Sequence, residues 1–246
     1  MKKFLNMFFL MLIAMTLATC KKDHMLDCFK SAGDETTENR DASPFVNIEL
    51  DDNVDLIINP NSDPYIKVTA GENLIDGIIT ELSGNTLYIR NENKCNWVRS
   101  FENTYTVEVG MNLPEHINYF GSGNITCIDS IRTPEFFFDC TNGSGSINFL
   151  FNSNHAEIRN HTGRTDIHLN GLCESVILFI NDVATLDASG LSAETAHVRN
   201  SSTGDLKVQA FGELSGEILY NGNVYYSGSP VISSMNITGK GKLINY

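Results

Sequence analysis

The sequence predicts an all-β protein, a right-handed parallel β-helix with about twenty residues and three short strands per coil. Three observations predict this fold. From Gly121 onward, apolar residues recur every 18 to 22 positions, they lie in short β-prone segments, and Gly, Asn and Ser separate these segments. Such a repeat is typical of a solenoid, in which each coil covers the core of the coil before it. The chain of 246 residues, 41% of them apolar, is sufficient for one such domain.

Three columns of apolar residues define the predicted coils. The first column follows a turn signal in each repeat and comprises Ile125, Ile147, Ile167, Leu186, Leu206, Val224 and Leu243. The second comprises Phe138, Ile158, Leu178, Val198, Ile218 and Ile237, and the third comprises Phe151, Leu172, Leu191, Phe211 and Val231. Equivalent positions of successive coils stack in a solenoid, so we expect all three columns to point into the core.

Polar residues recur at the corner that follows the second column. Cys140 occupies this corner in the first repeat, and four asparagines occupy it afterwards: Asn160, Asn181, Asn200 and Asn221. Asparagine tolerates left-handed backbone, and its side-chain amide bonds readily to the next coil. The spacing therefore predicts an asparagine ladder. The alternative is a row of polar ligands for a bound guest molecule.

Residues 44–120 keep the composition of β-strands but lose the twenty-residue period. Alternating segments such as 45–50, 86–89 and 105–109 predict strands, and longer excursions interrupt them. Terminal repeats of solenoids are atypical caps. We therefore expect one β-helix domain over 44–246, with irregular wider coils over 44–120 and regular coils over 121–246.

The N-terminus predicts export. Lys2 and Lys3 precede an apolar run that is too short to span a bilayer, so residues 1–19 read as a signal peptide. The run ends in Leu-Ala-Thr-Cys, which resembles the bacterial lipobox and implies acylation of Cys20. Residues 20–43 are mainly polar and predict a lipidated N-terminus and tether. We expect an extracytoplasmic, membrane-anchored lipoprotein at the outer membrane or cell surface; the alternative is a soluble exported protein with Cys20 merely near the cleavage point.

The net charge of −13 limits the classes of partner. Affinity for nucleic acid depends on neutralising phosphates with basic side chains, so an acidic chain disfavours it. The same repulsion disfavours anionic membranes and polyanionic glycans. We expect no nucleic-acid partner, and contact with a membrane through the lipid anchor only.

Motifs of catalysis and of metal binding are weak in this sequence. No Cys-x-x-Cys pair occurs and the histidines form no ligand pair, so we expect no metal and no cofactor. Three carboxylates, Asp166, Asp187 and Asp205, lie at outward positions beside the first column. Parallel β-helix glycosidases use neighbouring carboxylates as acid and base. We interpret the three residues as part of a solvated, charged face, with catalysis or cation binding as alternatives.

Tyrosines gather in the last coils, at Tyr220, Tyr225 and Tyr226. A solenoid must cover its last coil to prevent edge-to-edge pairing, so we interpret these tyrosines as a cover. The alternative is a contact surface for a glycan or a protein.

Glycine motifs provide a resemblance to a known family. Gly-Ser-Gly-Asn-Ile at 121–125, repeated as Gly-Ser-Gly-Ser-Ile at 143–147, resembles the putative auto-transporter adhesin, head GIN domain family. The resemblance extends to Asn-Leu-Ile at 73–75 and Leu-Tyr-Ile-Arg at 87–90. It implies a secreted, often lipid-anchored β-solenoid without an assigned catalytic residue.

A disulfide between Cys28 and Cys95 is a further prediction. Both cysteines lie outside the coil repeat in polar surroundings, and an exported protein meets an oxidising compartment. The segments around them, 27–31 and 93–97, look like the paired segments of the family's lipoprotein members.

These observations together predict a binding, adhesion or scaffolding module without catalysis. The partner is an unknown protein or glycan. The alternative is a glycan-active β-helix enzyme that uses Asp166, Asp187 or Asp205.

Overall fold

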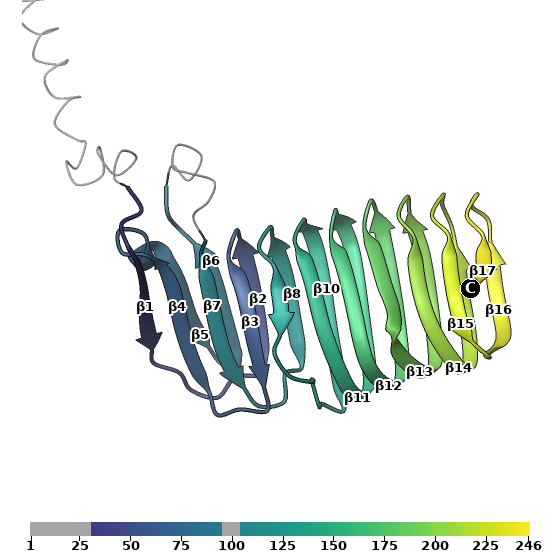
Figure 1. Cartoon of the computed structure of the whole chain (residues 1–246), viewed down its shortest axis with the longest axis horizontal. Helices are drawn as coiled ribbons and strands as arrows, with labels where there is room; N and C mark the ends of the chain where they lie inside the picture. Colours follow the sequence, from purple (N-terminus) through teal and green to yellow (C-terminus); the bar gives the residue numbers. More distant parts are fainter. Residues whose placement is uncertain (1–30, 95–103) are drawn as a thin grey trace, which may run out of the picture.

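The computed structural model describes residues 31–94 and 104–246, and within them the chain forms a parallel β-helix whose coils stack along the long axis (Figure 1). Cys20, Cys28 and Cys95 lie outside the described residues. The regular coils contain the strands β9 (Ile125–Cys127), β10 (Glu135–Gly143), β11 (Ser146–Gly163), β12 (Asp166–Asp182), β13 (Thr185–Ser202), β14 (Leu206–Ile218), β15 (Val224–Gly228), β16 (Val231–Ile237) and β17 (Leu243–Asn245).

Each regular coil presents two flat faces. In β11 the first face is formed by residues 146–153 and the second by residues 155–160, and buried and outward side chains alternate along both. Both faces of β11 pair in parallel with β12, so Ile147 lies beside Ile167 and Ile158 beside Leu178. Side chains that point inward therefore stack from coil to coil and form one continuous core.

The first predicted column is confirmed. Ile125, Ile147, Ile167, Leu186, Leu206, Val224 and Leu243 are in register from β9 to β17. All of them except Leu243, in the last coil, are fully buried. This column runs the length of the regular coils and fixes their alignment.

The second column is confirmed only as far as Val198, which pairs with Gly216 and not with Ile218. The reason is that the β13–β14 register shifts between Ala188 and Ser192, so the coil of β14 is shorter than the twenty-residue period. Ile218 lies beside Asn200 instead.

The third column is wrong at three of its positions. Phe151 and Leu191 are buried, but Leu172, Phe211 and Val231 have exposed fractions of 59%, 51% and 69%. Gly171, and not Leu172, lies in register with Phe151. The number of residues at the corner between the two faces differs from coil to coil, so residues at a constant sequence spacing do not occupy equivalent positions there.

The asparagine ladder is also corrected. Asn160 and Asn200 are buried, but Ile180 lies between them in register, so the two amides are two coils apart. Asn181 occupies the next position along the strand, where it pairs with Ser201, and Asn221 is exposed. The amide nitrogens of Asn160 and Asn200 donate to backbone carbonyls of the turns. Each of these asparagines therefore satisfies backbone carbonyl groups at its own corner, and the asparagines do not form one column.

The Gly-Ser-Gly motifs allow neighbouring coils to approach closely at a corner. A Cβ atom on Gly145 would lie 2.0 Å from the carbonyl oxygen of Gly123, and one on Gly123 would lie 1.9 Å from that of Val54. The hydroxyl of Tyr119 donates to the Gly123 carbonyl at 2.7 Å and accepts from the Gly145 amide at 3.1 Å. Only glycine fits these positions without moving the backbone of the adjacent coil.

The N-terminal coils do not stack in chain order. β2 (Asn47–Asp52) lies between β6 (Thr86–Asn91) and β8 (His116–Gly121) and is parallel to both. β3 (Asp55–Pro60) lies in the same way between β7 (Thr106–Met111) and β9. The first coil of the chain is therefore enclosed by two coils that come later in the sequence.

Antiparallel strands close the N-terminal end. β4 (Tyr65–Gly71) pairs with β7, β5 (Ile78–Ser83) pairs with β6, and β1 (Glu35–Arg40) pairs with β4. A short 3-10 helix, η3 (Ile75–Gly77), precedes β5. β1 corrects the prediction of a tether over the whole of 20–43. Its side chains are mostly exposed and its pairing uses backbone groups, so its polar composition gave no signal.

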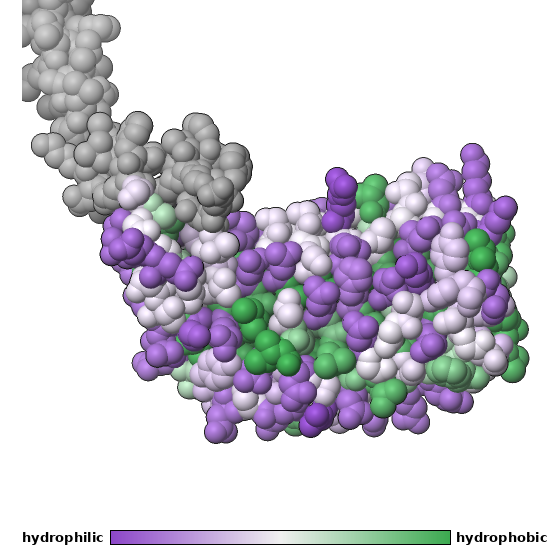
Figure 2. All heavy atoms as spheres, viewed as in Figure 1, coloured by the Kyte–Doolittle hydropathy of each residue, from purple (hydrophilic) through white to green (hydrophobic). Residues whose placement is uncertain are grey.

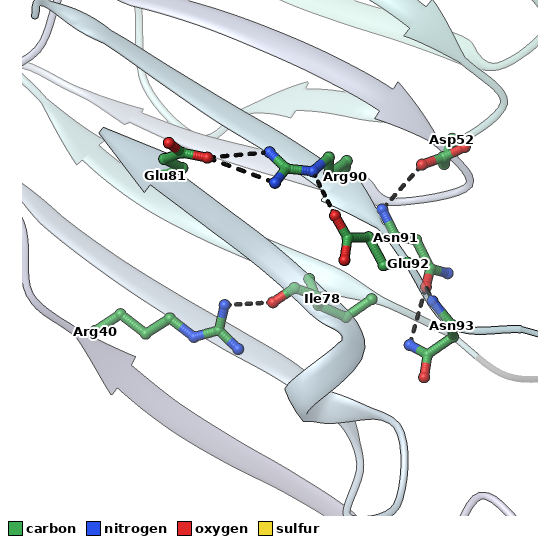
Figure 3. Close-up of polar contacts among 8 residues, drawn as sticks. All are labelled: Arg40, Asp52, Ile78, Glu81, Arg90, Asn91, Glu92 and Asn93. Carbon is green, nitrogen blue, oxygen red and sulfur yellow. Dashed lines mark hydrogen bonds and ion pairs between the residues drawn. The ribbon is translucent and has the colours of Figure 1, made fainter. Parts of the chain in front are cut away.

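Polar contacts join strands within the cap, within the first coils and between the two (Figure 3). The Arg40 guanidinium donates to the backbone carbonyls of Ile78 and, at 3.0 Å, Ile75. The carboxylate of Asp52 accepts from the backbone amide of Asn91 at 3.0 Å, which joins the end of β2 to the end of β6. Arg90 of β6 forms ion pairs with Glu81 and Glu92.

We expect Leu178→Ala to lower the free energy of unfolding by about 2–5 kcal/mol, because Leu178 is fully buried between Ile158 and Val198. The neighbouring substitution Ile177→Ala, at an outward position of the same strand, is the matched control, and we expect it to cost less than about 1 kcal/mol. Denaturant unfolding followed by circular dichroism measures both. Equal losses would contradict the assignment of core and surface on β12.

Candidate functional site

The outer surface of the second face carries the most distinctive group of side chains. Hydrophobic and hydrophilic side chains are intermixed on the surface of the solenoid, as the view in Figure 2 shows. On the second face, two rows of outward positions cross the strands β10 to β14. One row comprises Phe137, Glu157, Ile177, His197 and Ser215, and the other comprises Asp139, Arg159, Phe179, Arg199 and Glu217.

Phe179 is the centre of this surface. Arg159 and Arg199 lie on either side of it in register, so the ring has a guanidinium group in each neighbouring coil. The Arg199 guanidinium carbon is 5.1 Å from the centre of the Phe179 ring, within cation–π range. The His161 ring contacts the same phenyl ring edge-on at 5.9 Å. The Arg199 cation and the His161 ring therefore pack against a half-buried apolar ring at the surface of an acidic protein.

A shallow hollow of about 280 Å³ surrounds the ring. It is lined by Arg159, His161, Ile177, Phe179, His197 and Arg199, which we call the Phe179 patch. Further hollows follow it along the same face. One is lined in part by His116, Pro134 and Phe137, and another in part by His197, Glu217 and Met235. The second face thus offers a row of depressions suited to an extended partner.

Acidic side chains neutralise part of the positive charge. Arg159 forms an ion pair with Glu157, and Arg199 Nε lies 3.3 Å from Glu217 Oε2. These pairs fix the guanidinium groups beside Phe179 and leave their remaining N–H groups for a ligand.

Asp139 joins two histidines next to the patch. His116 Nε2 is 2.9 Å from one carboxylate oxygen and His161 Nε2 is 2.7 Å from the other. A carboxylate only accepts hydrogen bonds, so both ring nitrogens must donate. The bond from His116, opposed by partial burial and assisted by the bond from His161, lowers the pKa of Asp139 to about 2. Asp139 therefore positions the His161 ring against Phe179.

The three candidate catalytic carboxylates lie on the first face and do not converge. Lys207 Nζ is 2.8 Å from the Asp187 carboxylate. Partial burial opposes this contact, but hydrogen bonds from Lys207 and Ser189 keep the pKa of Asp187 below its ordinary value. A general acid of a glycosidase needs a raised pKa, so the environment of Asp187 does not suit that role.

Asp166 and Asp205 have local structural partners. Asp166 accepts from Thr185 Oγ1 at 2.5 Å and lies 3.1 Å from His168 Nε2. Asp205 accepts from the backbone amide of Asn223 at 2.8 Å. Asp166 pairs with Thr185, and Asp205 precedes Leu206, the partner of Leu186, so the two carboxylates are two coils apart. This geometry favours the interpretation as a solvated face.

The tyrosines of the last coils have different environments. Tyr226 packs partly against the end of the core. Tyr225 points outward in the row of Lys207 and contacts Tyr246 edge-on at 6.2 Å. Tyr220 is 50% exposed. Only Tyr226 therefore lies where a cover of the core would be.

Thiol and metal chemistry finds no support in the described part of the chain. Cys127, Cys140 and Cys173 are free. Burial raises the pKa of Cys140 and of Cys173 to about 11, so both thiols stay protonated at neutral pH. Within residues 31–94 and 104–246, no group of three or more His, Cys, Asp or Glu side chains is arranged to hold a metal ion. No helix in these ranges is long and apolar enough to cross a membrane.

Sequence reasoning missed the Phe179 patch. The segments Glu-Ile-Arg at 157–159 and His-Val-Arg at 197–199 show the alternation of an exposed strand, and the same period places Phe179 between the two arginines. The sequence signal that could have revealed the patch is Phe179 itself, an aromatic residue at a position where the repeats before and after it carry arginine.

One known protein family matches the part of the chain that forms most of the coils. The family model described as putative auto-transporter adhesin, head GIN domain, matches residues 44–230, most of the chain. The chain belongs to this family. The head GIN match begins just before β2 and ends just before β16, so it includes the Phe179 patch and the Gly-Ser-Gly corners.

Solved structures show the same fold for this head GIN protein. A putative adhesin from Bacteroides fragilis superimposes with a TM-score of 0.78 at 18% identity, covering 87% of this chain and 97% of the other. A putative adhesin from Parabacteroides distasonis gives 0.66 at 15% identity, covering 87% and 98%. A structure from the same organism described as a putative lipid binding protein gives 0.63 at 19% identity, covering 87% and 97%. No curated protein sequence matches the chain.

We expect the Asp139 site to make stability depend on acid pH. The folded pKa of about 2 lies below the ordinary value of 3.8, so the stabilisation is present above about pH 4 and is lost as the pH falls towards 2. Asp139→Asn should therefore reduce the fall in unfolding free energy between pH 4 and pH 2. Denaturant titrations at these two pH values measure it.

The double variant His116→Ala, His161→Ala is the control for this effect, because it removes both donors and leaves the carboxylate. We expect it to flatten the same part of the pH profile. An Asp139→Asn protein with the wild-type pH dependence would show that the pair of histidines does not stabilise the ionised carboxylate.

Proposed function

We propose that this protein is a lipid-anchored, extracytoplasmic adhesion module that binds a protein or glycan partner through the Phe179 patch, without catalysis. The observation that carries the proposal is the half-buried, outward-pointing Phe179 ring between Arg159 and Arg199. Membership of the head GIN family, whose description names an adhesin, supports the general role.

The chemistry of the patch suits recognition. Aromatic and arginine side chains supply much of the affinity at binding surfaces, because aromatic rings bury a large area and a guanidinium presents several hydrogen-bond donors in one planar group. Phe179 and Ile177 offer an apolar centre, while Arg159, Arg199 and His197 surround it with hydrogen-bond donors. This combination fits a partner that has an apolar face and acceptor groups at its edge, as sugars and many peptide segments do.

The environments of the three carboxylates on the first face support a role without catalysis. Asp187 is neutralised by Lys207, and Asp166 and Asp205 are bound by neighbouring coils. The hollows on the second face are lined by none of these three residues.

Anchoring through Cys20 would orient the module. β1, the first described strand, lies at the capped end of the solenoid, and the second face extends from there towards the opposite end (Figure 1). A lipid on Cys20 would hold the capped end near the membrane, so the Phe179 patch would lie further out and open to a partner.

We expect Cys20→Ser to move the protein from the membrane fraction to the soluble fraction, because two or more acyl chains are needed for firm attachment and this change removes their site. Fractionation with and without detergent measures the result. Detergent dependence that persists in the variant would contradict the anchor and would leave the binding proposal standing.

We expect Phe179→Thr to weaken binding by about tenfold or more, since truncating a central aromatic residue costs roughly 2 kcal/mol at a binding surface. The soluble Cys20→Ser chain, screened on a glycan array and against surface proteins, supplies the ligand for a titration. Phe211→Thr is the matched control, because Phe211 is a surface phenylalanine with an exposed fraction of 51% that lies at a corner outside the patch. A Phe179→Thr chain that binds as tightly as the parent would overturn the proposed site.

A further inference from the structure

The two ends of the solenoid differ in the protection of their outermost strands. At the capped end, β1 carries Glu35, Glu38 and Arg40. At the other end, β16 pairs only with β14, and β17 only with β15, among the described residues (Figure 1). Charged residues on an edge strand normally prevent two sheets from pairing. β16 and β17 contain no charged residue.

Side chains of β16 form a layer of core that nothing covers within the described residues. Ile232 is in register with the buried Leu214, and Ile237 with the buried Ile218. The exposed fractions of Ile232 and Ile237 are nevertheless 38% and 47%. Burying this apolar layer under another coil would be favourable, since an inner coil buries the same positions completely.

The charge distribution indicates which partner fits this end. The chain has 30 acidic residues, but none lies in residues 219–246, where Lys240 and Lys242 are the charged side chains. Two molecules that each carry a net charge of −13 repel one another. The last coil is the end at which two copies can approach without bringing acidic side chains of that coil together.

We propose that the last coil is an interface for a second copy of this chain, joined end to end about a two-fold axis perpendicular to the solenoid. Such a rotation reverses the direction of the coil, so β16 would pair antiparallel with β16 of the partner molecule and β17 with its β17. Unpaired N–H and C=O groups of both edges are then satisfied. The capped ends remain outside, so the assembly closes as a dimer and does not grow into a fibre.

The dimer would place two capped ends at opposite extremes of one rod. If both copies carry a lipid on Cys20, which is the anchor proposed above, the rod would join molecules on facing membranes. This consequence rests on the proposed function, whereas the dimer itself does not. The test below therefore uses chains without lipid.

Ser234, the central residue of β16, gives the sharpest test, because it is exposed and antiparallel pairing about the strand centre places it opposite its own copy. The full-length chain with Cys20→Ser should sediment as a concentration-dependent dimer in the micromolar range. Adding Ser234→Lys, or separately Ser234→Glu, should weaken dimerisation by about tenfold or more, because like charges then face each other. Mixing the two variants should restore the dimer through Lys–Glu pairs.

Ser144→Lys is the matched control, because Ser144 is an exposed serine at a corner far along the chain from the last coil, and it should dimerise like the parent. Circular dichroism and melting curves of the Ser234 variants should match those of the parent chain. A parent chain that stays monomeric throughout the micromolar range would overturn the proposal. So would a dimer that persists in both Ser234 variants, or a mixture of the two that remains monomeric.

Discussion

Register between neighbouring coils is the constraint on which this structure depends. Each coil supplies the hydrogen-bond partners of the next, and the same alignment decides which side chains meet. Ile147, Ile167 and Leu186 share one inward position because their backbones pair, and the stacked apolar groups reinforce that pairing. A slip of one residue would turn the core of a whole coil outward, so burial holds the register strongly. The corner glycines serve the same requirement, because they let the turns approach as closely as the strands do.

Placement of the surface groups follows from this alignment. Phe179 lies between two arginines because Arg159 and Arg199 occupy the same outward position in the coils on either side. Asp139 reaches His161 by the same means, across one coil boundary. A solenoid can thus assemble a row of chosen side chains from residues twenty apart without shaping a deep cleft. A flat, repeating surface of this kind suits recognition over an extended area more than it suits the enclosed geometry that catalysis requires.

Period and alternation were sufficient to predict the class of fold and the first apolar column. They failed where a coil changes length. Ile218 appeared equivalent to Val198 by spacing, but the shift between Ala188 and Ser192 places Gly216 there. The position of β2 between β6 and β8 leaves no trace in the order of the sequence, because pairing between parallel strands carries no local signal. The Phe179 patch was missed because its members are unremarkable one by one, and only the register shows that they are neighbours.

The enclosed position of β2 and β3 has a consequence for how the chain assembles. Both edges of this first coil are completed by strands that come later, β6 and β7 on one side and β8 and β9 on the other. During synthesis from the N-terminus, the first coil therefore keeps an open edge until β8 and β9 have emerged. The solenoid must grow from this coil in opposite directions, towards the antiparallel cap and towards the regular coils. The coil of β2 and β3 is thus an interior seed, and both ends of the rod are made around it.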